Sequence, residues 1–408
     1  MNRFAFIIHP IEPEDVARKF PFARWLPVSW VERLASGLPP LVASEITGVR
    51  SATGAETAGW FVAVPLSSRL FLELPEGRVM SKIVGAARLA ERLGAQIVGL
   101  GAMTSVVGDA GVTVARQVRI PVTTGNSYTV ATALEGVAWA ADRLGYDLHS
   151  LPIAVLGGTG SIGSACARIL ARQGYDLVLA ARRREKLEAL RERIKAETGR
   201  EVAVTTSVSQ ALRQAGAVIA VTSALDALIE PRDLRPGAIV CDVARPRNVS
   251  RQVVEARDDV LVFEGGAVQV PGAVDFGLDF GFPPGQSYAC MAETMILALE
   301  GRLEAFSLGR ELEVEKVEEI AHLARKHGFR LAGLRSFERA LTDEELDRVA
   351  ERARAARRGA RVAVQVAGAV TGLPAGQMDG PQAGQAVGQP EPSGRVLATL
   401  GTESLDSP

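Results

Sequence analysis

The stretch PIAVLGGTGSIGSACARILARQG (152–174) decides the fold of this chain. It opens as an apolar run, passes through a glycine-rich turn and continues with the pattern of a helix. A glycine turn between a strand and a helix is the fingerprint of dinucleotide binding. Glycine lets the backbone approach a pyrophosphate, and the helix N-terminus presents free N–H groups to it. The residues predicted to bind the cofactor here are Gly157, Thr159, Gly160, Ser161, Ile162 and Gly163.

Strand and helix patterns alternate on both sides of this turn. After it, apolar runs recur about every 25 residues, which is typical of a doubly wound parallel sheet. We therefore expect an α/β fold with a Rossmann cofactor domain over 151–275. Before the turn, a looser alternation predicts an α/β domain over 1–150. The strands expected in that first domain lie at 4–8, 44–49, 60–64, 96–100 and 118–122, and its clearest helices at 79–93 and 128–144.

The last part of the chain has a helical pattern that is followed by a glycine- and proline-rich tail. Apolar spacing predicts helices at 287–300 and 314–327, in a helical segment over 276–355 that packs back on the core. Thr342-Asp-Glu-Glu345 has the form of a capping box that opens another helix. Beyond it, 356–408 is rich in glycine and proline and has no apolar periodicity, which predicts a disordered tail.

The end of the second strand of the cofactor domain decides which dinucleotide fits. An NAD enzyme typically places Asp or Glu about 20 residues beyond the glycine turn, where it holds the ribose 2′-hydroxyl. This chain has Ala-Ala-Arg182-Arg183-Arg184 there instead. Guanidinium groups can grip a 2′-phosphate, so Arg182 and Arg183 predict NADPH as the cofactor.

Two further strands end in short polar segments that face the same crevice. The runs are AVIAVTSA, which contains Thr222 and Ser223, and AIVCDVA, which ends at Ala244. Ligands of open α/β sheets lie outside the carboxyl ends of the strands. These three residues are therefore candidates for the nicotinamide side, and equally for ordinary loop residues.

Composition excludes several classes of function. Lys and Arg number 46 against 47 Asp and Glu, so a net charge of −1 leaves no basic field for nucleic acid. Three widely spaced cysteines contain no CxxC, and the four histidines form no metal-ligand cluster, so no metal site is expected. No apolar run has the length of a membrane span or of a signal-peptide core. These features predict a cytoplasmic protein.

The three cysteines have different settings. Cys166 and Cys241 lie in apolar helix and strand patterns and are expected in the core. Cys290 falls in the first turn of the helix expected at 287–300. The positive end of a helix lowers a thiol pKa and favours the nucleophilic thiolate. Cys290 is therefore the candidate nucleophile, and a core position is the alternative.

The chain resembles the long-chain acyl-acyl-carrier-protein reductases from about residue 4 to about residue 334. The resemblance implies NADPH-dependent reduction of a fatty acyl thioester to an aldehyde through an acyl-enzyme. It places the nucleophile on Cys290 and makes 1–150 the acyl-substrate domain. The motifs that carry it are SEITGVRSATG (44–54), LGAMTS (100–105), RQVR (116–119), TTGNSYT (123–129), GGTGSIGS (157–164), GGAV (265–268), SYACMAETMILALEG (287–301) and KHGF (326–329).

Such a reaction needs hydrogen-bond donors for an oxyanion and a group that moves a proton. Thr104, Ser105 and Asn126 are candidate donors, and equally caps and turn formers; Asn126 and Ser127 have the form of N-caps for the helix at 128–144. His9, at the end of the first strand, is the best-placed imidazole, with a structural role as the alternative.

The resemblance also implies partners. The substrate would be a fatty acyl thioester, carried by acyl carrier protein or by coenzyme A. Because a fatty aldehyde product is apolar, it would bring the protein into transient contact with a membrane. The aldehyde would then be the substrate of a downstream aldehyde-consuming enzyme.

Two other functions remain open on the residues alone. One is a shikimate-dehydrogenase-like NADP oxidoreductase that reduces a small ketone with no covalent intermediate. The other is a module that senses NADP(H) without catalysis. The first predicts that activity survives replacement of Cys290, and the second predicts nucleotide binding without turnover.

Overall fold

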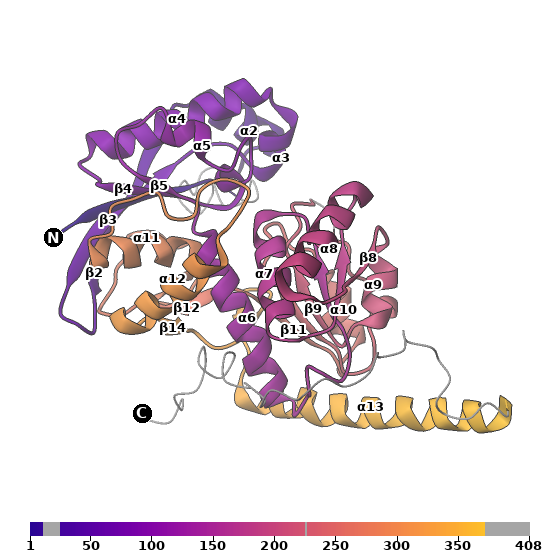
Figure 1. Cartoon of the computed structure of the whole chain (residues 1–408). Helices are drawn as coiled ribbons and strands as arrows, with labels where there is room; N and C mark the ends of the chain where they lie inside the picture. The colour runs from indigo at the N-terminus through magenta and orange to yellow at the C-terminus, as the bar shows by residue number, and fades with distance from the viewer. Residues whose placement is uncertain (11–24, 225–226, 372–408) are drawn as a thin grey trace.

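The computed structural model describes residues 1–10, 25–224 and 227–371, and its two large β-sheets face each other across shared helices (Figure 1). The first sheet has the strand order β2-β3-β1-β4-β5, and the second has β11-β10-β9-β6-β7-β8. The strands are β1 Arg3–Ile8, β2 Leu41–Arg50, β3 Glu56–Ala63, β4 Ile97–Leu100, β5 Val122–Thr123, β6 Ile153–Leu156, β7 Leu177–Ala180, β8 Ala203–Thr205, β9 Ala217–Ala220, β10 Ile239–Asp242 and β11 Leu261–Glu264.

The second sheet is a Rossmann sheet. All its strand pairs are parallel. Counted from β6, its order is the 3-2-1-4-5-6 arrangement of doubly wound dinucleotide-binding folds. The first sheet is parallel except for the antiparallel pair β2–β3 at its edge. The predicted α/β fold class is confirmed.

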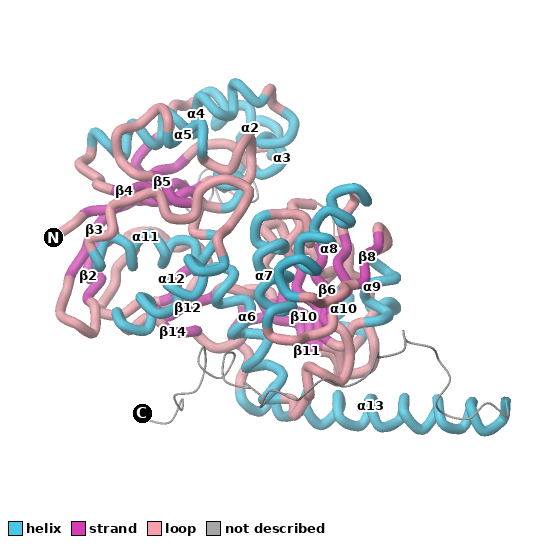
Figure 2. The backbone as a smooth tube through the Cα atoms, in the orientation of Figure 1, coloured by secondary structure: helices cyan, strands magenta, loops and turns pink. Residues whose placement is uncertain are grey.

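The helices enclose both sheets (Figure 2). In the first unit α4 covers one face of the sheet and α11 the other, while α9 and α10 cover the outer face of the Rossmann sheet. The helices are α2 Val28–Gly37, α3 Ser68–Glu73, α4 Glu76–Arg92, α5 Val112–Ala115, α6 Asn126–Arg143, α7 Ser161–Arg172, α8 Arg184–Thr198, α9 Val208–Gln214, α10 Arg251–Ala256, α11 Ala289–Glu300, α12 Val314–His327 and α13 Asp343–Thr371; two short 3₁₀ turns are η2 Ala102–Ser105 and η3 Pro231–Asp233.

One hydrophobic core joins the two sheets. Phe4 and Phe6 of β1 belong to the same buried cluster as Ile153 and Val155 of β6, and α6, α7, α11 and α12 fill the space between them. The helix α11 comes late in the chain, yet it packs on β1 and β4 at the other end of the sequence. We propose 150 and 275 as domain boundaries along the chain, although the packing between the units is continuous.

Small strands follow the Rossmann sheet. A three-stranded sheet has the order β13-β12-β14, and a two-stranded hairpin joins β15 and β16. Their bounds are β12 Ala267–Gln269, β13 Gln286–Tyr288, β14 Arg330–Leu331, β15 Arg335–Ser336 and β16 Arg339–Ala340.

Three sequence-based boundaries are wrong. The strand expected at 118–122 is reduced to β5 at Val122–Thr123, because Pro121 lacks the N–H that a ladder needs. The helix expected at 287–300 begins at Ala289, since Ser287 and its neighbours pair with β12 as β13. The tail expected over 356–408 is helical as far as Thr371, where α13 ends. The remainder of that tail lies outside the described residues.

Hydrogen bonds confirm the predicted capping box and join two distant motifs. The backbone N–H of Thr342 donates to the Glu345 carboxylate at 2.9 Å, and the Glu345 N–H donates back to the Thr342 hydroxyl at 3.3 Å, which is the capping box. The motifs around Ser51 and His327 meet in the interior. The Ser51 hydroxyl lies 2.8 Å from Nδ1 of His327, and Nε2 of the same ring lies 2.8 Å from the Glu300 carboxylate. This network ties the turn after β2 to the ends of α11 and α12.

Candidate active site

The carboxyl ends of the parallel strands of both sheets open onto one cavity of about 1400 Å³. Residues that follow β1 and β4 line one part of it, and residues that follow β6, β7, β9 and β10 line another. Cys290 lines the cavity as well. A dinucleotide crevice and a second, more apolar space are therefore continuous with each other.

The glycine turn after β6 lines the crevice. Gly157 follows β6 with a φ of +82°, a backbone conformation that favours glycine. A Cβ on Gly163 would collide with the carbonyl oxygen of Gly157, so the helix α7 can approach the turn closely only with glycine there. Thr159, Gly160, Ser161 and Ile162 line the cavity together with Gly157, whereas Gly163 acts through packing.

The basic residues after β7 reach the same crevice. Arg182 and Arg183 line it, joined by Lys186 and Thr206, which the sequence reasoning missed. None of these three cations forms an ion pair with another residue in the described part of the chain. Lys186 lies one turn into α8, so the helical spacing from Arg183 was the signal that could have found it.

The strand-end candidates also line the crevice. Thr222 and Ser223 follow β9, and Ala244 follows β10. The side chain of Asn248 accepts the Thr222 N–H at 3.0 Å, and the Asp242 carboxylate accepts the Ala244 N–H at 3.1 Å. These bonds fix the backbone of both loops at the edge of the sheet where a nicotinamide would lie.

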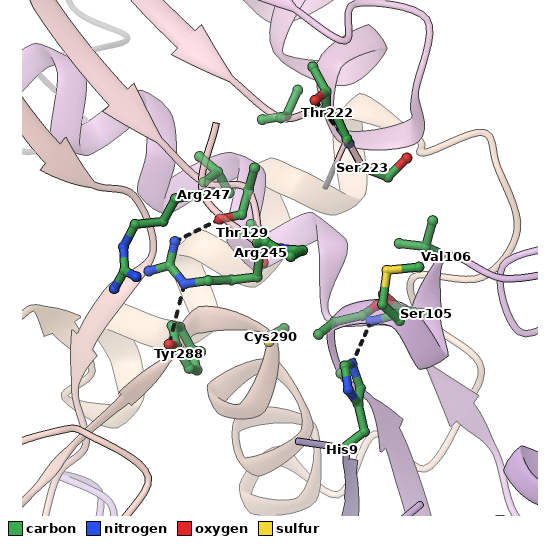
Figure 3. A pocket seen from close by; sticks show the side chains of 18 of the residues that line it. His9, Ser105, Val106, Thr129, Thr222, Ser223, Arg245, Arg247, Tyr288 and Cys290 are labelled. Atoms are coloured by element: carbon green, nitrogen blue, oxygen red, sulfur yellow. Dashed lines mark hydrogen bonds between the residues drawn. The ribbon is translucent and has the colours of Figure 1, made fainter. Parts of the chain in front are cut away.

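Cys290 is the second residue of α11 and is partly exposed to the cavity. Figure 3 shows Arg245 and Tyr288 to one side of it and His9 and Ser105 to the other. The N-terminus of α6 abuts it, because a Cβ on Gly125 would collide with both the Cα and the Cβ of Cys290. The thiol thus lies where the two parts of the cavity meet.

The protonation state of Cys290 differs from the sequence-based expectation. Burial raises the pKa of the Cys290 thiol to about 12, and the Glu293 carboxylate adds to the rise. A hydrogen bond from the Met291 backbone and the charge of Arg245 act in the opposite direction and are weaker. The expected thiolate is therefore not the form at neutral pH in this state of the protein. The pKa values of Cys166 and Cys241 are also raised by burial, as expected for core cysteines.

His9 is held by hydrogen bonds on both ring nitrogens. Nδ1 donates to the Pro10 carbonyl at 2.8 Å, and Nε2 accepts the Met103 N–H at 3.0 Å, an arrangement that assigns the neutral Nδ1–H tautomer. Its ring also packs on Phe71, with centroids 4.6 Å apart. His9 lines the cavity, but these bonds favour its structural interpretation.

The candidate oxyanion donors near β4 and α6 already form hydrogen bonds within the protein. The hydroxyl of Thr104 donates to Gly101 and that of Ser105 to Ala102, each at 2.7 Å, so both act as turn formers. Ser105 lines the cavity and Thr104 does not. The expectation that Asn126 caps its helix is wrong, because Gly125 takes the N-cap position and Asn126 and Ser127 are the first residues of α6. The Asn126 amide instead donates to the Ser161 hydroxyl at 3.3 Å and joins the starts of α6 and α7.

Further residues around Cys290 were missed by sequence reasoning. Arg245 stacks on Tyr288 at 5.3 Å from the ring centroid and pairs with Glu264 at 3.2 Å. Glu293, three residues after Cys290, accepts the Thr123 hydroxyl at 2.6 Å and the Tyr128 N–H at 2.9 Å. It thereby fixes the start of α6 against α11, and its burial raises the pKa of its carboxyl. The position of Arg245 and Glu293 in the sequence could have indicated them, since Arg245 follows a strand end and Glu293 lies one helical turn from the Cys290 thiol.

Comparison with known proteins places this arrangement in a family. A long-chain acyl-acyl-carrier-protein reductase of Synechococcus elongatus is 32% identical over 309 residues, which cover 72% of this chain and 88% of that protein. The chain belongs to the long-chain acyl-acyl-carrier-protein reductase family. A Serratia protein named aminotransferase PigE is 36% identical over 293 residues, or 71% of this chain, but the chain spans only 34% of its length.

The cofactor domain also matches a second group. The model of the shikimate / quinate 5-dehydrogenase family matches residues 139–264, which are the Rossmann part of the chain and the last residues of α6 before it. Among solved structures, the quinate dehydrogenase of Corynebacterium glutamicum in complex with NAD has a TM-score of 0.36 at 14% identity, covering 78% of this chain and 98% of that one.

The chain is an NADP-dependent oxidoreductase, and its cofactor is NADPH. The residues present fit this dinucleotide: a glycine turn open to close approach, and a strand end with cations and no carboxylate. Within the described ranges, no group of three or more His, Cys, Asp or Glu could hold a metal ion. No helix in that same part of the chain is long and apolar enough to cross a membrane.

Proposed function

We propose that this protein reduces a long-chain fatty acyl thioester to a fatty aldehyde through an acyl-enzyme on Cys290. The observation that carries the proposal is the place of Cys290, at the junction of an apolar space and a dinucleotide crevice. A thiol at such a junction can hold an acyl group with its chain on one side and its carbonyl carbon beside the nicotinamide position.

The apolar space suits a fatty acyl chain. It is bounded by the first sheet on one side and by α2 on the other, with apolar residues of α2 at helical spacing toward it. Its lining residues include Phe6, Ile8, Leu34, Leu38, Ala43, Phe61, Ala63, Met103 and Phe280. Each methylene buried there contributes about 0.8 kcal/mol of binding free energy. The predicted role of 1–150 as the acyl-substrate domain is supported by this lining.

The first chemical step exchanges one thioester for another. The sulfur of Cys290 attacks the carbonyl carbon, the bond from that carbon to the carrier sulfur breaks, and the carrier leaves as a thiol with the proton that Cys290 gives up. Bound NADPH supplies the hydride that reduces the acyl group to the aldehyde level. The bond from the acyl carbon to the Cys290 sulfur then breaks, the aldehyde leaves, and a proton on the sulfur restores the thiol. The two electrons of the hydride balance the reduction.

The residues around Cys290 have defined parts in this scheme. The guanidinium of Arg245 places a positive charge near the thiol and the reacting oxygen, where charge develops. Ser105 and His9 are within the lining and could donate to that oxygen only by leaving their present partners, whereas the Asn126 amide has a second N–H besides the one that bonds to Ser161. Thr222, Ser223 and Ala244 would position the nicotinamide, and Arg182 and Arg183 would hold the 2′-phosphate.

The decisive experiment separates acyl transfer from reduction. The protein is incubated with palmitoyl-coenzyme A without NADPH and analysed by intact-mass spectrometry, and we expect one acyl adduct on Cys290. Cys290→Ala should form no adduct and no aldehyde, whereas the matched control Cys166→Ala, in the core, should keep both. Aldehyde formation at the wild-type rate by Cys290→Ala would overturn the covalent scheme. It would favour direct hydride transfer to the thioester with no covalent intermediate.

Partners follow from the same chemistry. The name of the Synechococcus relative supports an acyl carrier protein as the acyl donor. The product would be taken up by an enzyme that consumes aldehydes. The Serratia relative is named an aminotransferase, and an aldehyde is a carbonyl compound that an aminotransferase can convert into an amine.

A further inference from the structure

A second group of arginines lines the cavity beyond the nicotinamide position. Arg247 and Arg251 follow β10, and the ring of Phe337 lies between them, at 5.5 Å and 4.8 Å from the two guanidinium carbons. All three residues line the cavity. Figure 3 shows Arg247 beside Arg245, on the side of the cavity away from His9.

This group is too far along the sheet to serve the adenosine end of the cofactor. Arg182 and Arg183 follow β7, whereas Arg247 follows β10, and the strand order between them is β7-β6-β9-β10. Three strand spacings of roughly 4.8 Å separate the two groups by about 14 Å. The glycine turn, where the pyrophosphate binds, lies between them after β6.

The charges in this part of the cavity do not cancel. Arg245 and Arg247 both pair with Glu264, and Arg247 also pairs with Glu338 at 3.1 Å. Arg251 forms no ion pair with any residue in the described ranges. Asp242 also interacts with Arg245, and the buried Arg335 interacts with Glu264 and Glu338. Four guanidinium groups therefore lie near three carboxylates, which leaves one positive charge in excess for an anion.

The fold holds this site in place at a local cost. Phe337 and Glu338 form the tip of the β15–β16 hairpin with φ of +49° and +69°, a left-handed conformation that is unfavourable for non-glycine residues. Glu264 accepts the Glu338 N–H at 2.9 Å, and the buried Arg335 donates to the Glu338 carbonyl. The hairpin tip thus keeps Phe337 between the two arginines.

We propose that Arg251 and Arg247 bind the phosphate of the phosphopantetheine arm that carries the acyl group. This inference rests on the proposed function. With the acyl chain in the apolar space of the first sheet, the carrier sulfur must leave Cys290 on the opposite side, toward these arginines. The cavity lining after β9 and β10 also includes the apolar residues Ala224, Ala227, Leu228 and Val249, which suit the methyl groups of the arm. The phosphate is shared by coenzyme A and acyl carrier protein.

The test uses two substrates that differ only in this phosphate. Octanoyl-4′-phosphopantetheine and octanoyl-pantetheine are compared with the wild type and with Arg251→Ala. We expect the wild type to have at least a tenfold higher kcat/KM for the phosphorylated substrate, since a charge-assisted hydrogen bond contributes about that factor. Arg251→Ala should lose this preference and keep its KM for NADPH. Arg232→Ala, an exposed arginine outside the cavity, is the matched control and should behave as the wild type.

Further measurements separate the sources of the phosphate and the two proposals. Equal losses with octanoyl-coenzyme A and octanoyl-acyl carrier protein support the shared phosphate, and a loss with octanoyl-coenzyme A alone overturns it. An equal loss on phosphorylated and unphosphorylated substrates also overturns it, even if both are reduced. If the wild type reduces no thioester, the proposed function fails. Calorimetric binding of 4′-phosphopantetheine, weakened in Arg251→Ala, still supports the phosphate site, and the absence of binding overturns it.

Discussion

At Cys290 two opposing influences act on one thiol. The start of α11 and the charge of Arg245 favour the thiolate, whereas burial and Glu293 favour the neutral thiol and prevail, raising the pKa to about 12. A thiol that is neutral in the free enzyme resists oxidation and alkylation.

The raised pKa predicts the pH dependence of alkylation. Because the pKa lies above the working range, the thiolate fraction and the rate of modification of Cys290 by iodoacetamide should rise about tenfold per pH unit from pH 7 to 9. Peptide mass spectrometry of the cofactor-free protein measures this rate. Arg245→Met removes a positive charge and should slow the reaction at each pH. A plateau below pH 9 would contradict the raised pKa.

The selection of NADPH predicts a second effect at a single residue. Arg182→Ala should raise KM for NADPH about tenfold or more and leave KM for NADH almost unchanged, since only NADPH has the 2′-phosphate. Arg184→Ala is the matched control, because Arg184 lies next in the sequence, pairs with Glu188 and does not line the cavity. Steady-state kinetics with both cofactors measures the ratio, and an equal change for both would remove the assignment.

The sequence predicted single residues where a local rule was sufficient. The glycine turn and Arg182 needed only their order along a strand and a helix, and the structure brings them to one crevice. The state of the Cys290 thiol depends on how much protein surrounds it, which the sequence does not reveal. Arg245 was missed because its role arises from Tyr288 and Glu264, which come from other elements.

Three helices begin at one place in the molecule. The first residues of α6, α7 and α11 meet around the cavity, where Asn126 bonds to Ser161 and Gly125 touches Cys290. Glu293 binds the start of α6 from within α11. The TTGN and ACMAE motifs, although far apart in the sequence, therefore contact each other at this place.

This contact predicts a large effect of one methyl group. Gly125→Ala adds a Cβ that collides with Cys290, in a backbone conformation of φ +72°, and should destabilise the fold by roughly 3 kcal/mol or more. Gly199→Ala is the matched control. Gly199 ends α8 with φ +71° and has open space around its Cα, so it should cost only about 1 kcal/mol. Urea denaturation measures both, and similar losses would contradict a close approach of α6 to Cys290.

Elements were predictable where their signal was local. The capping box at Thr342 and the glycines after α4 and α12 mark the ends of helices that formed as expected. The first turn of the helix expected at 287–300 became β13, because it pairs with β12 from a distant part of the chain. Such pairing depends on tertiary contacts and leaves no periodicity in the sequence.

In the proposed reaction, the cofactor and the acyl chain would be bound by two different sheets that share one core. The Rossmann sheet presents its strand ends to the cofactor, and the first sheet presents Phe6, Phe61 and Ala63 to the apolar space. α11 carries Cys290 between them while packing on β1 and β4. The geometry of the candidate site therefore depends on the relative position of both sheets, and the proposed nucleophile lies on a helix between them.

This arrangement predicts that residues of the first sheet determine which lengths of acyl chain the protein accepts. Ala63→Phe fills part of the apolar space and should exclude several methylenes of a long chain, at about 0.8 kcal/mol each. The kcat/KM for palmitoyl-coenzyme A should fall about 100-fold if four methylenes lose their place, while butyryl-coenzyme A should change little. Ala58→Phe, on the same strand but outside the cavity lining, is the matched control. Aldehyde formation across a series of chain lengths measures the effect. An equal loss for short and long chains would mean that the acyl chain lies elsewhere, because a block that acts on the chain must spare substrates too short to reach it.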